Sequence, residues 1–549
     1  MIDDNEKRVA DIIDSAIDFS PIDTDAQTIR DGAKPKLLIE NTDPHRTVAA
    51  IRDVIAKHGP LFERGAPVRL VADRQTGTVT ARRLTPDSLV MMVHELSRPY
   101  TLKVKDGISH EHNQRLPRSL AVAYLDWHGE WELRPLNGVA ATPLLHADGS
   151  ILSVNGYDDT TGIWLENVLD VTPLVPQYPT QVEAQAALKL IRGTFASFCF
   201  ADAPTIRNAA TSPTVDLSQS PGQDETAFLV ALLTAVCRPS LDLAPGFLIR
   251  APQLSGAGSG KGLLARSICR IAFGREPHAV TGGTDLPELE KRIVAELIGG
   301  SSVMFLDNLN NVTFRSNLLA SAITERPARV RILGKSEMLP LNATAMVILT
   351  GNALSMSEDL ARRFIVIELD PRIEDPETRS FSVDIRQAVT ERRAELLALV
   401  LTIWRWGRQN PNLPRGLPLG SFEQWGRWVR DPLLALGCHD PVERLVDAKK
   451  KDGQRQEIVE LFLRWQHFHG DKPVTAHDLH VQLKQAIDPQ KRGRQFIASQ
   501  VAKLVDARVG GFTLSRQASG KWSADTYALR SCDGPGSHRE HRDHGTSNE

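Results

Sequence analysis

The stretch at residues 251–266 limits the possible folds of this chain more than any other part of the sequence. It reads APQLSGAGSGKGLLAR, with an apolar run before it and the helix-like run LLARSICRIAF at its end. A strand, a glycine-rich loop and a helix in this order are typical of a site that holds a polyphosphate against the N–H groups of a helix N-terminus. The glycines permit close approach, and Lys261 is expected to reach the β- and γ-phosphates. The predicted nucleotide-binding residues are Gly256, Ala257, Gly258, Ser259, Gly260, Lys261 and Gly262.

This loop departs from the pattern G-x-x-x-x-G-K-[ST] at two positions. Ser255 stands at the first glycine, and Gly262 stands at the Ser or Thr whose hydroxyl normally holds magnesium. We therefore expect a metal site that is partly rearranged. A flexible glycine turn without a ligand is the alternative interpretation, and the strand and helix on either side of the loop disfavour it.

Two apolar runs further along the chain end in residues suited to nucleotide chemistry. Residues 302–307, SVMFLD, predict a buried parallel strand that presents Asp307 to Mg²⁺. Asn308 follows as a candidate catalytic residue, where many ATPases place a glutamate that activates water. Residues 345–349 predict another strand, after which Asn352 is expected to orient the attacking water or to sense the γ-phosphate.

An arginine pair completes the set. Residues 359–363, DLARR, end a short helical stretch before the apolar run at residues 365–369. Arg362 or Arg363 is predicted to act as an arginine finger on the nucleotide of a neighbouring subunit, an effect worth about a thousandfold or more in rate. A solvated surface pair is the alternative for these two residues alone. The order of glycine loop, Asp, Asn and arginine pair, each beside an apolar run, favours the catalytic interpretation.

This ordered set resembles superfamily 3 helicases of the AAA+ class, in particular the helicase part of primase-helicase proteins of phages, plasmids and integrated elements. The resemblance covers residues 220–375. It is carried by SGAGSGKG, by ELEKRIVAELIGGSSVMFLDN, by RVRILGKSEMLPL, and by MVILTGN followed by DLARRF. It implies a P-loop ATPase core that assembles into a homo-oligomeric ring.

The resemblance also implies a hairpin that enters the central channel and grips DNA. The hairpin would span residues 329–341, with Arg331 and Lys335 facing the nucleic acid. An ordinary surface hairpin with two exposed cations is the alternative for these residues.

The resulting expectation is an ATP-dependent DNA helicase or translocase that replicates a mobile genetic element. Its cofactors would be ATP and Mg²⁺, and its partners single-stranded or forked DNA and a separate primase. Gly262 and Asn308 keep an alternative open, a DNA-binding replication initiator that uses ATP as an assembly switch without efficient hydrolysis. A primase with its own polymerase site is disfavoured, because no strand carries a pair of catalytic acids.

Length and composition fit a multidomain α/β protein. The chain has 549 residues, more than one core usually supports. Its net charge of −2 means that any DNA binding must come from local basic patches. The five cysteines show no metal-like pairing and indicate reduced thiols, and no run is apolar enough to span a bilayer. With an acidic, polar start instead of a signal peptide, the expected location is cytoplasmic, without a membrane partner.

The domains follow from these patterns. We expect a mobile arm at residues 1–34, an α+β domain at 35–205, the ATPase at 206–375, a helical lid or connector at 376–454, and a disordered tail at 531–549. Residues 385–406 predict one long helix. Trp404, Trp406, Trp425 and Trp428 fit a core cluster, with stacking on DNA bases as the alternative, and His110 and His112 fit loop polarity, not a zinc site.

Residues 455–530 predict three helices followed by a β-hairpin, the order of a winged helix. The third helix, the turn before it and the hairpin tip carry cations where phosphates would be met. A winged helix that binds protein is the alternative. The predicted DNA-binding residues here are Arg492, Arg494, Lys503, Arg516 and Lys521.

Overall fold

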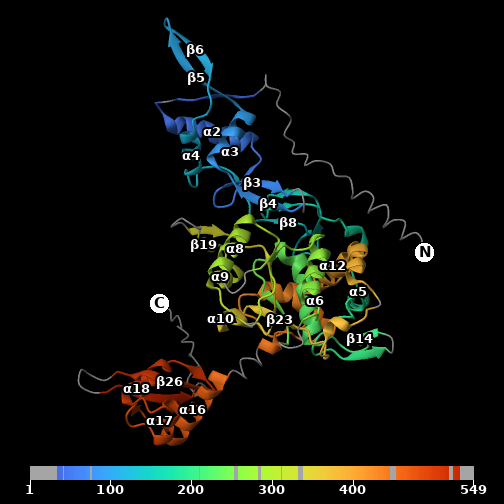
Figure 1. Ribbon diagram of the computed structural model, residues 1–549, viewed down its shortest axis with the longest axis vertical. Helices are drawn as coiled ribbons and strands as arrows, with labels where there is room; N and C mark the ends of the chain where they lie inside the picture. Colours follow the sequence, from blue (N-terminus) through green and yellow to red (C-terminus); the bar gives the residue numbers. More distant parts are fainter. Residues whose placement is uncertain are drawn as a thin grey trace, which may run out of the picture. The chain divides into compact units, whose positions relative to one another are not determined.

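The structure is a computed structural model, and its internal contacts divide the chain into two compact units, Met1–Val442 and Glu443–Glu549 (Figure 1). The structure describes residues 34–40, 42–73, 77–208, 211–252, 257–281, 286–310, 312–331, 338–381, 383–445, 453–518 and 524–531. The chain is a mixed α/β protein with several sheets, as the sequence predicts. Of the predicted arm and tail, only Lys34 and Ser531 lie within the described residues. In the described part of the chain, no helix has the length and apolar character needed to cross a membrane.

A five-stranded parallel sheet forms the centre of the first unit. Its strand order is β16-β17-β21-β15-β23. The strands are β15 (Gly246–Ala251), β16 (Ala279–Val280), β17 (Val303–Leu306), β21 (Met346–Asn352) and β23 (Phe364–Glu368). After β15 the chain crosses to the far edge and returns strand by strand, and then places β23 on the other side of β15. Open α/β sheets bind ligands in the crevice outside the carboxyl end of the strand at such a reversal, which here is β15.

Apolar helices cover this sheet. Helix α6 (Gln223–Cys237) is buried over almost its whole circumference, and ten of its fifteen residues are apolar. It packs against β23, against α7 (Lys261–Phe273) and against α12 (Arg393–Gln409), which in turn lies along α5 (Gln181–Thr194) (Figure 1). Helix α8 (Leu286–Gly299) connects β16 to β17. A buried helical layer thus packs against the sheet.

Residues before α6 build smaller sheets and helices. The first sheet has order β1-β5-β6, the second β4-β3-β2-β7 and the third β11-β12-β8. The bounds are β1 (Lys36–Leu38), α2 (Pro44–His58), β2 (Leu61–Glu63), β3 (Pro67–Ala72), β4 (Val79–Arg83), α3 (Pro86–Leu96), β5 (Arg98–Lys105), β6 (Ile108–Asn113), α4 (Arg118–Leu125), β7 (Arg134–Pro135), β8 (Gly138–Ala140), β9 (Leu144–Leu145), β10 (Ile151–Leu152), β11 (Gly156–Asp158), β12 (Ile163–Leu165), β13 (Thr205–Asn208) and β14 (Thr211–Val215).

The hairpin of β5 and β6 projects beyond the helices α2, α3 and α4 (Figure 1). The prediction of a loop around His110 and His112 was wrong, because both lie in strand β6. Every residue of β6 is exposed, so the strand has no alternation of apolar and polar residues for a sequence pattern to detect.

One buried arginine ties this portion to the end of α8. Arg64 is only 4% exposed and donates to the carbonyls of Leu297 and Ile298, the last turn of α8, at 2.8 and 3.1 Å. Its other donors reach the carbonyls of Leu136 and Asn137 at 3.0 and 2.6 Å. Burial lowers the Arg64 pKa to about 10. The guanidinium therefore caps α8 and joins two parts of the unit through backbone acceptors.

Shorter elements complete the first unit. They are η1 (Thr172–Leu174), η2 (Arg238–Ser240), β18 (Thr313–Phe314), α9 (Asn317–Thr324), β19 (Ala328–Arg331), β20 (Met338–Leu341), β22 (Ser355–Met356), α10 (Glu358–Ala361), η3 (Pro376–Thr378), α11 (Ile385–Glu391), α13 (Glu423–Trp425), the π-helical turn η4 (Gly426–Arg430) and α14 (Asp431–Ala435). The single helix predicted at residues 385–406 is wrong, because the chain breaks between α11 and α12. Arg393, at the break, donates to the carbonyls of Ile271 and Ala272 near the end of α7. The four tryptophans expected in the core are buried.

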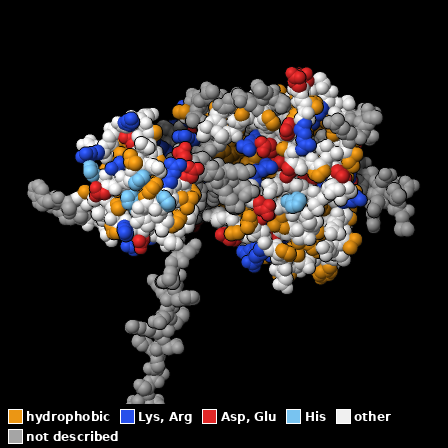
Figure 2. Space-filling view, turned by 90° about the horizontal axis from the view of Figure 1, so that it is seen from below, with side chains coloured by type: hydrophobic (Ala, Val, Ile, Leu, Met, Phe, Trp, Pro, Cys, Tyr) orange, Lys and Arg blue, Asp and Glu red, His pale blue; other side chains and the backbone are white. Residues whose placement is uncertain are grey.

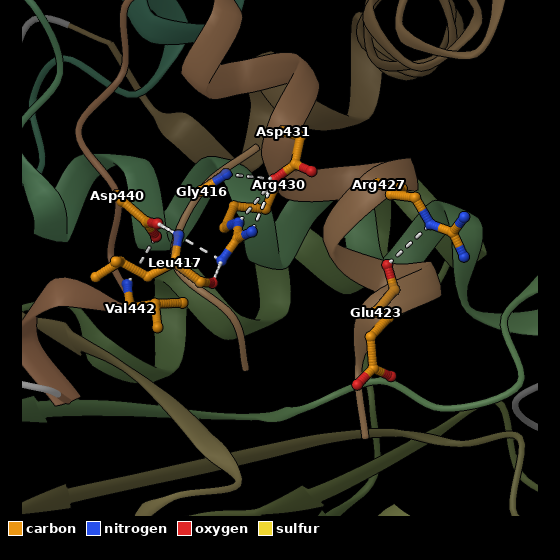
Figure 3. A network of polar contacts seen from close by, with 8 residues as sticks. All are labelled: Gly416, Leu417, Glu423, Arg427, Arg430, Asp431, Asp440 and Val442. Atoms are coloured by element: carbon orange, nitrogen blue, oxygen red, sulfur yellow. Dashed lines mark hydrogen bonds and ion pairs between the residues drawn. The ribbon is translucent and has the colours of Figure 1, made fainter. Parts of the chain in front are cut away.

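A closed polar network, defined here as Arg430, Asp431 and Asp440, holds the last part of this unit together (Figure 3). All three side chains are at most 7% exposed. Arg430 donates to Asp431 Oδ1 at 2.8 and 3.0 Å and lies 3.5 Å from Asp440 Oδ2. The carboxylates also accept from the backbone N–H groups of Gly416, Leu417 and Val442 at 3.2, 2.9 and 2.9 Å. The network thus joins residues 416–417 and 442 to η4 and α14 through buried charges that pair with one another.

The second unit has its own core. It consists of α16 (Gly453–His469), β24 (Val474–Thr475), α17 (Val481–Ile487), α18 (Arg494–Lys503), β25 (Arg508–Val509), β26 (Phe512–Gln517) and β27 (Thr526–Ser531). The sheet has order β24-β27-β26-β25 and is antiparallel. Phe462, Trp465, Leu483, Val501 and Leu514 are fully buried between the helices and the sheet. Three helices and a hairpin are thus found in the predicted order.

Candidate nucleotide site

The glycine loop leads from the carboxyl end of β15 into α7. Gly258 has φ +69° and Gly260 has φ +93°, and both values favour glycine over residues with a side chain. Ser259 between them is fully buried. Lys261 is the first residue of α7, and its Nζ donates to Ser259 Oγ at 3.1 Å. The loop thus presents the start of α7 and one ammonium group on the crevice side of the sheet, while Gly256 lies outside the described residues.

Burial changes the chemistry of this lysine. Desolvation lowers the pKa of Lys261 below its ordinary value of 10.5, and the negative charge of Asp307 opposes the shift. A polyphosphate beside the ammonium group would stabilise its charged form. The site therefore favours an anionic ligand at Lys261.

Two segments that the sequence did not mark hold the loop from outside. Arg379 Nη2 donates to the carbonyls of Gly258 and Ser259 at 3.2 and 3.3 Å, and Cys199 Sγ donates to the Ser259 carbonyl at 3.5 Å. A Cβ at Gly258 would lie 3.0 Å from the amide nitrogen of Glu377. No sequence signal pointed to Arg379, because it follows the predicted end of the ATPase at residue 375. Its guanidinium is a further cation beside the loop.

Asp307 follows β17 and lies next to the end of β21. Its Oδ2 accepts from Arg266 Nη2 at 3.0 Å, and its Oδ1 accepts from the Thr350 hydroxyl. Thr350 also accepts from the Asn308 N–H at 3.1 Å. The predicted acid is therefore at the carboxyl edge of the sheet, with an arginine and a threonine that the sequence analysis did not single out.

Three asparagines join the ends of β17 and β21. Asn308 has φ +65°, a conformation that asparagine adopts more readily than glutamate. Asn310 Nδ2 donates to Asn308 Oδ1 at 2.6 Å, and the Asn352 N–H donates to Asn310 Oδ1 at 2.7 Å. Asn352 Oδ1 is buried and has no hydrogen-bond partner among the described residues. Asn310 thus positions both predicted asparagines, although no pattern in the sequence marked it.

The Arg266 guanidinium lies directly beside Gly262, one turn earlier on α7. A Cβ at Gly262 would lie 2.5 Å from Arg266 Nη1 and 3.9 Å from Asp307 Oδ1. The Arg266 guanidinium, 3.0 Å from Asp307 Oδ2, would repel a divalent cation bound there, and position 262 supplies no hydroxyl. The residues as they stand do not fit a magnesium ion bound directly at Asp307, and its predicted role in holding the metal stays a prediction. In the described parts of the chain, no group of three or more His, Cys, Asp or Glu residues could hold a metal ion.

The arginine pair lies at the opposite edge of the same sheet. The Arg363 carbonyl accepts from the N–H of Gly246, the first residue of β15. The glycine loop follows the last residue, Ala251, five steps or roughly 17 Å further along the strand. Both Arg362 and Arg363 pair with Asp359, and Arg362 is 57% exposed. The pair therefore does not serve the glycine loop of its own chain.

The predicted DNA hairpin is described only at its base. Strands β19 and β20 pair antiparallel, with Arg331 opposite Met338. Arg329 and Arg331 are exposed on one face, while Val330 is buried on the other. Lys335 lies outside the described residues.

Cations of the second unit are exposed and spread over its surface. Arg492, Arg494 and Lys503 are exposed, and the Arg492 guanidinium lies 4.6 Å from the ring centroid of Phe496. Arg516 donates to Asp525 at 2.8 Å, so its charge is partly neutralised. On the face seen in Figure 2, Lys and Arg side chains are scattered among hydrophobic and histidine side chains. Lys521 lies outside the described residues.

Comparisons with known proteins add little to this geometry. No family model and no curated protein sequence matches the chain. A solved structure with some similarity is the A form apo structure of the NrS-1 C-terminal region, at TM-score 0.33 and 13% identity. The match covers 89% of this chain and 99% of that one. A likeness of this size carries no argument about fold or activity.

Proposed function

We propose that this chain is an ATP-dependent DNA helicase or translocase with a P-loop ATPase core. The observation that carries the proposal is the meeting of Lys261, Asp307 and Asn352 at one edge of a parallel sheet. Lys261 and Asn352 are 91 positions apart in the sequence. The carboxyl ends of β15, β17 and β21 nevertheless bring all three residues to the edge where such sheets bind ligands. ATP would lie against the amides at the start of α7, with Lys261 on its phosphates.

The positions of the other predicted residues support a shared site. Asn352 has a buried oxygen without a partner among the described residues and would orient the attacking water. Arg362 and Arg363 lie too far from their own glycine loop to contact its nucleotide, so they would act on the nucleotide of a neighbouring copy. A nucleotide site that takes its glycine loop from one copy and its arginines from the next supports a homo-oligomeric ring. Cytoplasmic location and a separate primase partner stay predictions.

The proposed DNA contacts rest on the cations of two elements. Arg331 and Lys335 would face DNA from the β19–β20 hairpin, and the second unit would bind DNA as a winged helix. Helix α18 begins at Arg494 and ends at Lys503, so its exposed cations suit phosphate contacts. The scattered charge favours backbone contacts over sequence readout.

The test is DNA-stimulated ATP hydrolysis and separation of a forked duplex by the full chain. Lys261→Ala should reduce nucleotide affinity by at least about tenfold, because it removes a charge-assisted contact to phosphate. Lys291→Ala is the matched control, since Lys291 is exposed on α8 and pairs with Glu288 at 3.2 Å. Wild-type protein that neither hydrolyses ATP nor separates strands on any DNA structure would contradict the proposal.

A second candidate is a replication initiator that uses ATP as an assembly switch. Asn308 favours it, because an amide is a poor base and its left-handed backbone disfavours glutamate at this position. Nucleotide-dependent assembly without turnover, measured by light scattering and phosphate release on the same sample, would select this candidate.

A further inference from the structure

The Arg266 guanidinium lies so close to position 262 that it would have to shift to admit a serine or threonine side chain there. Residues 262 and 266 lie one turn apart on α7, so they share a face of the helix. A Cβ at 262 would meet Arg266 Nη1 at 2.5 Å, while Arg266 Nη2 lies 3.0 Å from Asp307 Oδ2. The absence of a side chain at position 262 therefore lets Arg266 lie against Asp307.

Neighbouring groups hold this guanidinium in place. Its centre lies 5.3 Å from the centroid of the Phe305 ring, a distance suited to a cation–π contact. Glu276 Oε2 lies 3.8 Å from Arg266 Nε. The side chain is nevertheless 30% exposed, and that of Asp307 is 20% exposed. A fixed positive charge thus stands beside the predicted metal-binding acid and remains accessible from solvent.

We infer that Arg266 takes the place of the divalent cation at Asp307, so that this site binds the polyphosphate of a nucleotide without requiring magnesium. The inference rests on the proposed nucleotide binding and adds the identity of the cation. A guanidinium carries five N–H donors and forms charge-assisted hydrogen bonds to phosphate oxygens. It also neutralises Asp307, which would otherwise repel the phosphates.

The first test is a titration of the wild-type full chain with a fluorescent ATP analogue, once with excess Mg²⁺ and once with EDTA. The two dissociation constants should agree within about threefold, less than 1 kcal/mol. Binding at least about tenfold weaker in EDTA would overturn the inference and leave nucleotide binding intact. Absence of binding in both buffers would contradict the proposed function itself. This measurement needs no variant to fold.

The second test exchanges the two cations. Arg266→Ala should weaken binding in EDTA by about tenfold or more, and Arg266→Lys, which keeps the charge, should recover part of the loss. The double variant Gly262→Ser with Arg266→Ala should bind at least about tenfold more tightly with Mg²⁺ than with EDTA. Binding by Arg266→Ala in EDTA equal to that of wild type would overturn the inference.

Arg270→Ala is the matched control. Arg270 lies one further turn along α7, has the same 30% exposure and pairs with Glu276 at 3.0 Å, but it makes no contact with Asp307. Its replacement should change neither the affinity nor the effect of EDTA. An equal loss in Arg270→Ala and Arg266→Ala would trace the effect to the Glu276 cluster and overturn the assignment to the Asp307 contact.

Discussion

Two aspartate–arginine arrangements of the first unit, the closed polar network and the Arg266–Asp307 pair, differ in how completely they are buried. In the closed polar network, Asp431 and Asp440 face Arg430 at no more than 7% exposure, and backbone N–H groups complete their hydrogen bonds. In the candidate nucleotide site, the side chains of Arg266 and Asp307 are 30% and 20% exposed and lie beside Gly262, which has no side chain. Similar chemistry therefore serves two purposes. A sealed pair stabilises the fold, whereas a pair open to water can exchange partners with a ligand.

The largest expected effect on stability comes from breaking the closed polar network. Arg430→Met should lower the free energy of unfolding by about 3–5 kcal/mol, because it leaves two buried carboxylates without their cation. Denaturant unfolding followed by tryptophan fluorescence measures it. Arg427→Met is the control, since Arg427 is exposed and donates a 3.4 Å hydrogen bond to the Glu423 carbonyl (Figure 3). Its loss should change stability by about 0.5 kcal/mol or less. Similar losses in both variants would show that burial does not distinguish them.

A second buried pair tests how much stability is lost when a single buried carboxylate loses its arginine. Arg192 donates to both oxygens of Glu225 at 2.7 and 3.0 Å, with exposures of 7% and 3%. Arg192→Met should cost about 3 kcal/mol, the low end of the range, because one acid is left unpaired instead of two. Arg118→Met, which breaks an exposed pair with Asp87, should cost about 1 kcal/mol or less by the same measurement. A reversed order of these two losses would refute the burial argument.

The open pair should matter less for stability. Arg266→Met is expected to lower the free energy of unfolding by about 1 kcal/mol or less, because water reaches Asp307 and Thr350 still donates to it. Chemical denaturation without nucleotide, beside Arg430→Met, measures the difference. A loss as large as that of Arg430→Met would make the Arg266–Asp307 pair a structural element and remove the basis for ligand exchange there.

Much of this arrangement could be predicted from local sequence, and the rest depends on tertiary contacts. The apolar runs before Lys261, Asp307 and Asn352 predicted the central strands, because buried parallel strands are continuously apolar. Arg266 and Thr350 gave no signal, since one is an ordinary helix residue and the other lies at the end of an apolar run. Thr350 meets Asp307 because β17 and β21 are neighbours in the sheet, and Arg266 reaches Asp307 from α7. Arg379 also gave no sequence signal, because it reaches the glycine loop through a tertiary contact from a segment that follows all of the predicted motifs.

The smallest expected effect on stability belongs to the exposed Asp359 with its two arginines. The Arg363 hydrogen bond, and after it the positive charges of both arginines, holds the pKa of Asp359 below its ordinary value of 3.8. A depressed carboxylate pKa contributes stability above the unfolded value and loses it as pH falls through the folded value. Asp359→Asn should therefore change unfolding by the same small amount, about 0.5 kcal/mol or less, at every pH from 5 to 8.

Asp359→Asn also separates stability from assembly. Without the carboxylate, Arg362 and Arg363 lose the group that orients both guanidiniums at the amino edge of the sheet. If they act on the nucleotide of a neighbouring copy, ATP hydrolysis should fall by about tenfold while nucleotide affinity stays at the wild-type value, since the glycine loop lies at the other edge. Parallel hydrolysis and binding measurements decide the point. An equal loss of affinity would instead connect the arginine pair to the site of its own chain and contradict a shared site.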